Sequence, residues 1–264
     1  MRETDPVAKG TPENYCSRLW AAIYDQYHSG HEAELAFYVS ALRGVTGPVL
    51  EAACGTGMVL LPLLALGLDA HGFDVSQEML DVLLAKADAS RTEGIERRVT
   101  CQDLVNFDYD LRFDAVIIPA RSFLHLTTQE EQIGCLRTIH RHLVPSGRLL
   151  LNFFTPNLSF VVARTKPDPP FEEFATYTHP VTRKPVKLSF RQVNDPGNQL
   201  QRITWRFLYD GRIHDTEMAV RWIYRSEFEL LARLTGYGIA HLYGGFSREP
   251  YDGTAEMVWE LTKS

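Results

Sequence analysis

A glycine turn between a buried strand and a helix is the stretch of this chain best suited to chemistry. Residues 49–57 read Val-Leu-Glu-Ala-Ala-Cys-Gly-Thr-Gly, which predicts a strand and a tight turn before a helix begins near Met58. Asp74 ends a second apolar run. Glycines let the backbone approach a ligand, a helix N-terminus offers free N–H groups, and such an acid can accept hydrogen bonds from both ribose hydroxyls. The pattern predicts a nucleoside pocket.

The residues around the turn separate several kinds of ligand. A phosphate-binding loop needs lysine and serine or threonine after its last glycine, but methionine and valine follow Gly57. A dinucleotide site favours a small residue three positions further on, where this chain has Leu60. Glu51 instead suits a ligand that carries an ammonium or a sulfonium. A turn without any ligand would leave Asp74 and Asp103 unexplained.

The elements that position these residues alternate between apolar strands and helices. We expect strands at residues 49–53, 70–74, 99–101, 115–118 and 148–154, and helices at 58–66, 77–89 and 128–143. This alternation is typical of a parallel sheet covered on both faces, in which ligands bind at the carboxyl ends of the strands. Gly55, Gly57, Asp74, Asp103 and Ala120 all fall at those ends.

The flanking segments differ in texture from this core. Aromatic residues crowd a helical stretch at 14–42, which His28-Ser29-Gly30 breaks in two. Residues 155–182 resemble a loop, and the alternating runs after it predict an antiparallel insert of about three strands. A helix at 226–234 and strands at 239–243 and 257–262 complete the chain. We expect four parts: a tail and helical lid (1–44), a core (45–155), the insert (156–224) and a final helix with two strands (225–264).

Bulk composition excludes several functions. The chain has 264 residues, of which 27 are basic and 33 acidic, so its net charge of −6 shows no electrostatic footprint for nucleic acid. It contains no apolar stretch near the ~20 residues of a membrane span and no apolar signal core. Its four scattered cysteines form no C-x-x-C pair, which favours free thiols in the cytoplasm and no metal site. We therefore expect a small-molecule partner, without nucleic acid or membrane.

Four motifs together resemble the class I S-adenosylmethionine-dependent methyltransferases. They are Glu51-Ala-Ala-Cys-Gly-Thr-Gly57, Asp74-Val-Ser-Gln-Glu-Met-Leu80, Gln102-Asp-Leu104 and Phe113-Asp-Ala-Val116. Their order and spacing resemble the family over residues 45–155, although the family often has glycine where Ala53 stands. The resemblance implies an α/β fold, a doubly wound, Rossmann-like sheet of seven mostly parallel strands. The last helix and strand pair resemble the reversed final hairpin of that sheet.

The resemblance also implies which residues contact the cofactor, S-adenosylmethionine. Glu51 would meet its amino group through water, Asp74 both ribose hydroxyls, and Asp103 the adenine amine. Val75 and Met79 would pack beside the adenine, and residues 119–121 would line the methionine side. The full set is Tyr15, Tyr24, Glu51, Ala53, Gly55, Gly57, Asp74, Val75, Met79, Asp103, Leu104, Pro119, Ala120 and Arg121.

The aromatic N-terminal helices and the late insert resemble those of small-molecule enzymes, the glycine N-methyltransferases and the sugar N-methyltransferases of antibiotic biosynthesis. In that branch the N-terminal segment closes over the cofactor and the insert covers the substrate. Tyr15, Tyr24 and Tyr27 are then lid candidates, unless this aromatic stripe only packs the helix on the sheet. The insert also allows a homodimer contact.

Transfer from a sulfonium is an in-line displacement, in which the protein mainly supplies alignment and a dry site. His125, close after the fourth strand, is the first catalytic candidate, and Tyr24 is the second; His125 packing against the next helix is the alternative. We predict a methyltransferase acting on nitrogen or oxygen of a small-molecule acceptor, in secondary metabolism. A non-catalytic S-adenosylmethionine-binding protein and a nicotinamide-dependent oxidoreductase, which Leu60 disfavours, remain as alternatives.

Overall fold

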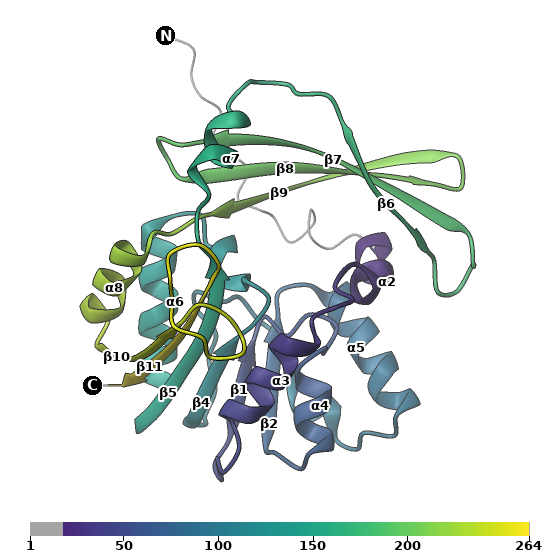
Figure 1. Cartoon of the computed structure of the whole chain (residues 1–264). Coiled ribbons are helices and arrows are strands. Elements are labelled where there is room, and N and C mark those ends of the chain that lie inside the picture. The colour runs from purple at the N-terminus through teal and green to yellow at the C-terminus, as the bar shows by residue number, and fades with distance from the viewer. Residues whose placement is uncertain (1–17, 264) are drawn as a thin grey trace.

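Residues 18–263 are described by the computed structural model in Figure 1, so Tyr15 and the expected tail lie outside the described residues. The core is a seven-stranded sheet in the order β10-β11-β5-β4-β1-β2-β3. Its strands are β1 (Val49–Ala52), β2 (Ala70–Asp74), β3 (Val99–Cys101), β4 (Phe113–Ile118), β5 (Leu143–Phe154), β10 (Tyr237–Tyr243) and β11 (Glu256–Lys263). β1 to β5 pair in parallel, and β11 is antiparallel to both β5 and β10. The predicted, mostly parallel sheet is therefore confirmed.

The strand order reverses beside β1. The chain adds β2 and β3 on one side of that strand, and β4 and β5 on the other. Ligands of open α/β sheets bind outside the carboxyl ends of the strands at such a reversal. The glycine turn follows β1, Asp74 ends β2, and Ala120 follows β4 closely. The topology thus brings these residues to one edge of the sheet.

Helices cover both faces of the sheet. They are α4 (Leu60–Ala65), α5 (Gln77–Ala89), α6 (Gln129–His142) and α8 (Arg225–Leu234), with short 3-10 turns η1 (Ile95–Arg97) and η2 (Ser122–His125). Ser76 caps α5 by accepting a hydrogen bond from the Met79 N–H, and Thr128 and Glu131 form a capping box on α6. α4 begins two residues later than its predicted start. Gly57 has a left-handed φ of +78°, which is incompatible with an earlier helical turn.

Two hydrophobic clusters hold the layers together because residues along each strand point alternately to opposite faces. Leu50 of β1 packs in the cluster that includes α6 and α8, whereas Val49 packs in the cluster that includes α4 and α5. All four residues of β1 are buried. Full burial of a valine or leucine side chain stabilises the fold by about 1.5–3 kcal/mol. The glycine turn is therefore anchored to the most buried strand of the sheet.

The insert is a second, four-stranded antiparallel sheet in the order β6-β7-β8-β9. Its strands are β6 (Glu172–Thr178), β7 (Pro185–Asp195), β8 (Leu200–Tyr209) and β9 (Arg212–Arg221), preceded by α7 (Leu158–Ala163). The expected loop at 155–182 and the count of about three strands were wrong. β6 is an edge strand whose side chains are all exposed or half-buried, so it lacks a clear apolar alternation.

Two N-terminal helices connect the insert with the core (Figure 1). They are α2 (Arg18–Tyr27) and α3 (Glu32–Ala41). Trp20 of α2 belongs to a buried cluster with Phe207 of β8 and Met79 of α5, so α2 packs against both the insert and the core. Tyr38 of α3 donates a hydrogen bond to Asn152 Oδ1 of β5, 2.7 Å away. The helical lid is thus seated on the carboxyl edge of the sheet.

Candidate active site

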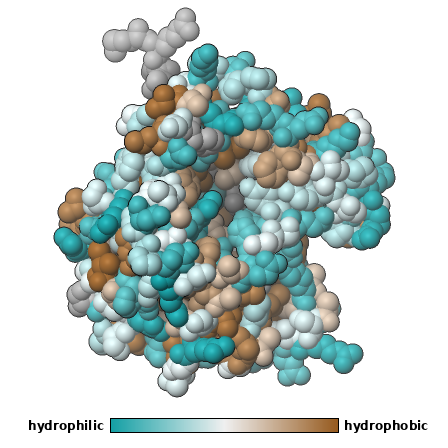
Figure 2. Space-filling model, viewed as in Figure 1, coloured by the Kyte–Doolittle hydropathy of each residue, from teal (hydrophilic) through white to brown (hydrophobic). Residues whose placement is uncertain are grey.

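Two cavities open where the insert overhangs the core, a region that is hollowed in the space-filling view (Figure 2). The first, about 200 Å³, is lined by the glycine turn, the end of β4 and the break between α2 and α3. The second, about 560 Å³, is lined by Asp74, the loop after β3, η2 and β9. Tyr24, Ala53 and Gly55 line both. Pockets for one small ligand span roughly 300–1,000 Å³, so the second cavity has room for a ligand of nucleoside size.

The glycine turn is tightly packed on both sides. A Cβ atom on Gly57 would stand 2.8 Å from Leu83 Cγ of α5, and one on Gly55 would stand 3.8 Å from a ring carbon of Tyr24. Ala53 also adopts a positive φ, 60°, just before the turn. Leu60 packs where a Cβ on Gly72 would stand. A large side chain therefore fills the space that a dinucleotide site needs for close helix–strand packing.

Asp74 is held between the loop that follows β1 and the loop that follows β2. Its Oδ2 accepts a hydrogen bond from the Gly55 N–H and its Oδ1 accepts one from the Ser76 N–H, both at 2.9 Å. Burial raises the pKa of Asp74, and these backbone hydrogen bonds oppose that shift. A carboxylate oxygen can accept more than one hydrogen bond. Both oxygens can thus still receive a ribose hydroxyl from the second cavity.

Glu51 is a buried carboxyl group on the wall of the first cavity. Glu51 is only 3 % exposed, and within residues 18–263 no group donates a hydrogen bond to its Oε2. Burial and the nearby charges of Asp74 and Glu34 raise its pKa well above the usual range. A cationic group in the cavity would relieve this cost, since buried charges require a partner. The predicted contact with the cofactor's amino group, which the structure does not test, fits this position.

The residues predicted to surround the adenine line the second cavity. Val75, Met79, Asp103 and Leu104 come from the loops after β2 and β3 and from α5. Asp103 is exposed, and its Oδ1 accepts a hydrogen bond from the Val105 N–H at 2.7 Å. Their roles stay predictions, but the fold brings all four to one wall.

Of the three residues predicted to line the methionine side, which all follow β4, only two line a cavity. Pro119 and Ala120 line the first cavity, whereas Arg121 lines neither. The guanidinium of Arg121 forms an ion pair with Glu256 at 2.7 Å and lies over the ring of Phe154, and its contact with the methionine portion stays a prediction. Ala120 and Arg121 both have left-handed φ values, 55° and 61°.

His125 and Tyr24 lie on the wall of the same large cavity. His125 ends η2, and burial lowers the pKa of its imidazole to about 4, opposed by a hydrogen bond with the backbone of Ala219 in β9. The imidazole is therefore neutral at neutral pH. The predicted catalytic pair is thus brought together, although its role stays a prediction.

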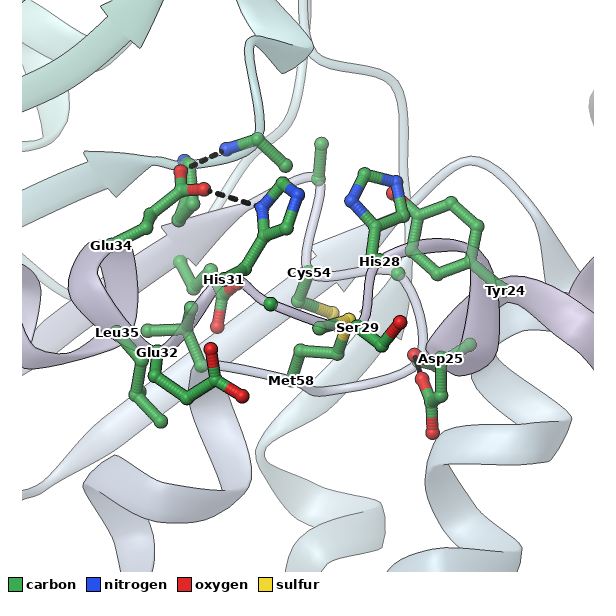
Figure 3. Close-up of a pocket in the computed structure, with 18 residues that line it drawn as sticks. Tyr24, Asp25, His28, Ser29, His31, Glu32, Glu34, Leu35, Cys54 and Met58 are labelled. Atoms are coloured by element: carbon green, nitrogen blue, oxygen red, sulfur yellow. Dashed lines mark hydrogen bonds and ion pairs between the residues drawn. The ribbon is translucent and has the colours of Figure 1, made fainter.

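The first cavity also contains a group of residues to which the sequence analysis gave no binding role. His28 and His31 lie in the break between α2 and α3, where their rings are 4.8 Å apart (Figure 3). Glu34 accepts hydrogen bonds from the Ala120 N–H at 2.7 Å and pairs with His31 Nδ1 at 3.0 Å. The segment at 28–30 was interpreted only as a helix break. Two histidines and a glutamate at spacings of three were the available signal.

Tyr24 offers a test that separates packing from chemistry. We expect Tyr24→Ala to weaken binding of S-adenosylhomocysteine roughly tenfold, because the ring covers the glycine turn and aromatic burial is lost. Tyr24→Phe keeps the ring and should bind with parental affinity. Calorimetric titration and turnover are measured on both variants. A Phe variant that binds normally but turns over slowly assigns the hydroxyl a role in the transfer; weakened binding in that variant contradicts the packing argument.

The described residues contain neither a metal-binding cluster nor a membrane-spanning helix. Among residues 18–263, no group of three or more His, Cys, Asp or Glu side chains could hold a metal ion. The helices in that same range are all too short or too polar to cross a membrane.

A strand-order reversal that carries a glycine turn, an acid predicted to bind ribose and overlying helices is typical of the nucleoside sites of open α/β sheets. Residues 49–147 match the methyltransferase domain family. The cypemycin N-terminal methyltransferase of a Streptomyces species is 29% identical over 235 residues, which cover 88% of this chain and 89% of the relative. The glycine/sarcosine N-methyltransferase of Halorhodospira halochloris is 32% identical over 157 residues, 58% of this chain and 56% of the relative.

Solved structures show the same fold over nearly the whole chain. The CcbJ methyltransferase from Streptomyces caelestis has a TM-score of 0.74 at 23% identity, covering 95% of this chain and 98% of that one. Together, the fold, the four motifs and the match of residues 49–147 to the methyltransferase domain family support a class I S-adenosylmethionine-dependent methyltransferase. The predicted family and cofactor are therefore confirmed, and the nicotinamide and non-catalytic alternatives gain no support.

Proposed function

We propose that this enzyme methylates an amine nitrogen of a small-molecule acceptor. The observation that carries the proposal is the charge of the cavity walls. The second cavity is lined by four acidic residues, Asp74, Asp103, Glu131 and Glu217, and within residues 18–263 neither lysine nor arginine lines either cavity. A cleft lined by one sign of charge concentrates ligands of the opposite sign. An acceptor that arrives as an ammonium fits this wall better than an anionic one.

The chain's own residues have three tasks in this reaction. Bound S-adenosylmethionine supplies a methyl group that is already activated on a sulfonium. Asp74 and Glu51 would hold the donor's ribose and amino group, and such alignment contributes roughly 7–11 kcal/mol in favourable cases. The apolar wall of Met79 and Met218 limits water in the second cavity. An acceptor that arrives as an ammonium first releases one proton to water, because only the neutral amine has a lone pair. His125 would accept at its imidazole the proton that the nitrogen loses after methylation.

The pKa of His125 bears on the choice between nitrogen and oxygen. A hydroxyl acceptor needs a base whose pKa lies near the working pH, because the oxygen must lose its proton as it attacks. With a pKa of about 4, His125 is poorly suited to that task. A neutral amine already carries a lone pair and needs only a site for the departing proton. Relatives named as N-methyltransferases support the same choice.

Matched acceptors test the proposal. The purified enzyme is incubated with methyl-labelled S-adenosylmethionine and pairs of small molecules that differ only in an amine or a hydroxyl. We expect label on the amines, with one or two added methyl groups by mass spectrometry. Label confined to hydroxyls overturns the nitrogen assignment. A homodimer through the insert and a cytoplasmic location stay predictions from the sequence.

A further inference from the structure

The two sides of the first cavity suit ligand groups of opposite charge. Glu51, with its unsatisfied buried oxygen, lies on the β1 side. His28 and His31 lie on the lid side, and among the described residues that line this cavity His31 is the one that can carry a positive charge near neutral pH. The amino-acid tail of S-adenosylmethionine is a zwitterion. Its ammonium matches Glu51, which leaves its carboxylate without an assigned partner.

His31 is held in place by a buried carboxylate. Glu34 is 5 % exposed, and its two oxygens engage different groups: Oε1 accepts from the Ala120 N–H and Oε2 pairs with His31 Nδ1. Because Nδ1 is engaged, Nε2 is the nitrogen of His31 that remains for a ligand. The side chain of His31 is 41% exposed and lines the cavity, so a ligand can reach it. Figure 3 shows the Glu34 carboxylate beside the His31 ring, with a dashed line for the contact between them.

We propose that the His31–Glu34 pair receives the carboxylate of the methyl donor, and that donor affinity is therefore controlled by the protonation of His31. Glu34 acts as the positioning residue, since it fixes both the imidazole and the Ala120 backbone beside the methionine tail. The inference rests on the identity of the donor and is independent of the acceptor.

Several charged groups face His31 from the elements around it. Glu34 of α3 raises its pKa most, through the hydrogen bond; Glu256 of β11 also raises it, and Arg121 after β4 and burial lower it. The net pKa of His31 is raised. His28 is the neighbour in the break, and burial followed by the charge of His31 lowers its pKa to about 4, so it stays neutral. The protonated state of His31 is thus present at lower pH and is lost as pH rises through its raised pKa.

Calorimetric titration with S-adenosylhomocysteine between about pH 6 and pH 9 tests the proposal without any turnover. We expect the affinity to fall by up to about tenfold per pH unit above the pKa of His31, with up to about one proton taken up on binding, seen as a dependence on buffer ionisation heat. The decarboxylated analogue, which keeps the ammonium, should show neither effect. His31→Gln should remove the pH dependence, and Glu34→Gln should move its midpoint to lower pH.

His214→Asn, at an exposed strand residue of the insert outside both cavities, is the matched histidine control and should titrate like the parent. An unaltered pH dependence in His31→Gln overturns the proposal, as does the same dependence with the decarboxylated analogue. If Glu34→Gln does not fold, as judged by circular dichroism, the His31 variant and the analogue still decide. Loss of methyl transfer to amines would contradict the proposed function and leave this binding result standing.

Discussion

Asp74→Ala is expected to weaken binding of S-adenosylhomocysteine by at least about 100-fold. Hydrogen bonds to a charged group contribute about 1.5–3 kcal/mol each, so two ribose contacts contribute about 3–6 kcal/mol, and every 1.4 kcal/mol is tenfold in affinity. The variant also frees the Gly55 and Ser76 N–H groups that the carboxylate now holds. Equilibrium dialysis or calorimetry measures the effect directly.

Two further variants show whether the loss comes from the ribose contact. Asp74→Asn keeps the shape but replaces one acceptor oxygen with a donor that faces backbone N–H groups, so a similar loss is expected. Asp103→Ala removes an exposed acid of the same cavity and should cost much less, because an exposed hydrogen bond competes with water. Parental affinity in Asp74→Ala means that the nucleoside lies elsewhere.

His125→Ala should lower turnover about 100-fold and leave the affinity for S-adenosylhomocysteine nearly unchanged. General base catalysis contributes roughly 10²–10⁴-fold, and we expect the lower end because the pKa of His125, about 4, lies far below neutral pH. Single-turnover rates and calorimetry on the same preparation separate the two quantities. Unchanged turnover removes His125 from the mechanism and leaves the packing alternative.

The pH dependence gives a second test of His125. Burial lowers its pKa, so the imidazole is already neutral above about pH 5 and can accept a proton throughout the physiological range. Its contribution is lost only as pH falls through about 4. Any rise in rate between about pH 6 and pH 9 should therefore follow deprotonation of the acceptor amine, and should persist in the residual activity of His125→Gln.

Elements with strong local signals were predicted well. β1 and β4 are largely apolar and buried, and α5 and α6 begin at side-chain caps that are visible as Ser76 and Thr128. β6 and α7 were missed because their residues are mostly exposed, and an exposed edge strand has no apolar alternation to reveal it. The start of α4 was placed too early, since the left-handed conformation of Gly57 is a backbone property that residue type only permits.

The residues of the candidate site also differ in how well the sequence predicted their positions and contacts. Motif spacing was enough to place Glu51, Asp74 and Asp103 at the carboxyl edge, because each lies at or just beyond the carboxyl end of a strand of a parallel sheet. The ion pair of Arg121 was not predicted, since its partner Glu256 lies 135 residues away in the chain. No local sequence pattern indicates a partner at that distance along the chain.

The sequence by itself determined the class of enzyme, the methyl donor and the edge of the sheet at which we expect the donor to bind, because these depend on short motifs and on the order of strands and helices. Only the tertiary structure decided which residues of the N-terminal helices face the predicted donor site. His31, Glu34 and Ala120 meet because α3 packs over the end of β4, and His125 gains its lowered pKa because β9 of the insert buries it. Burial and long-range contact are properties of the folded chain, so residue spacing alone does not contain them.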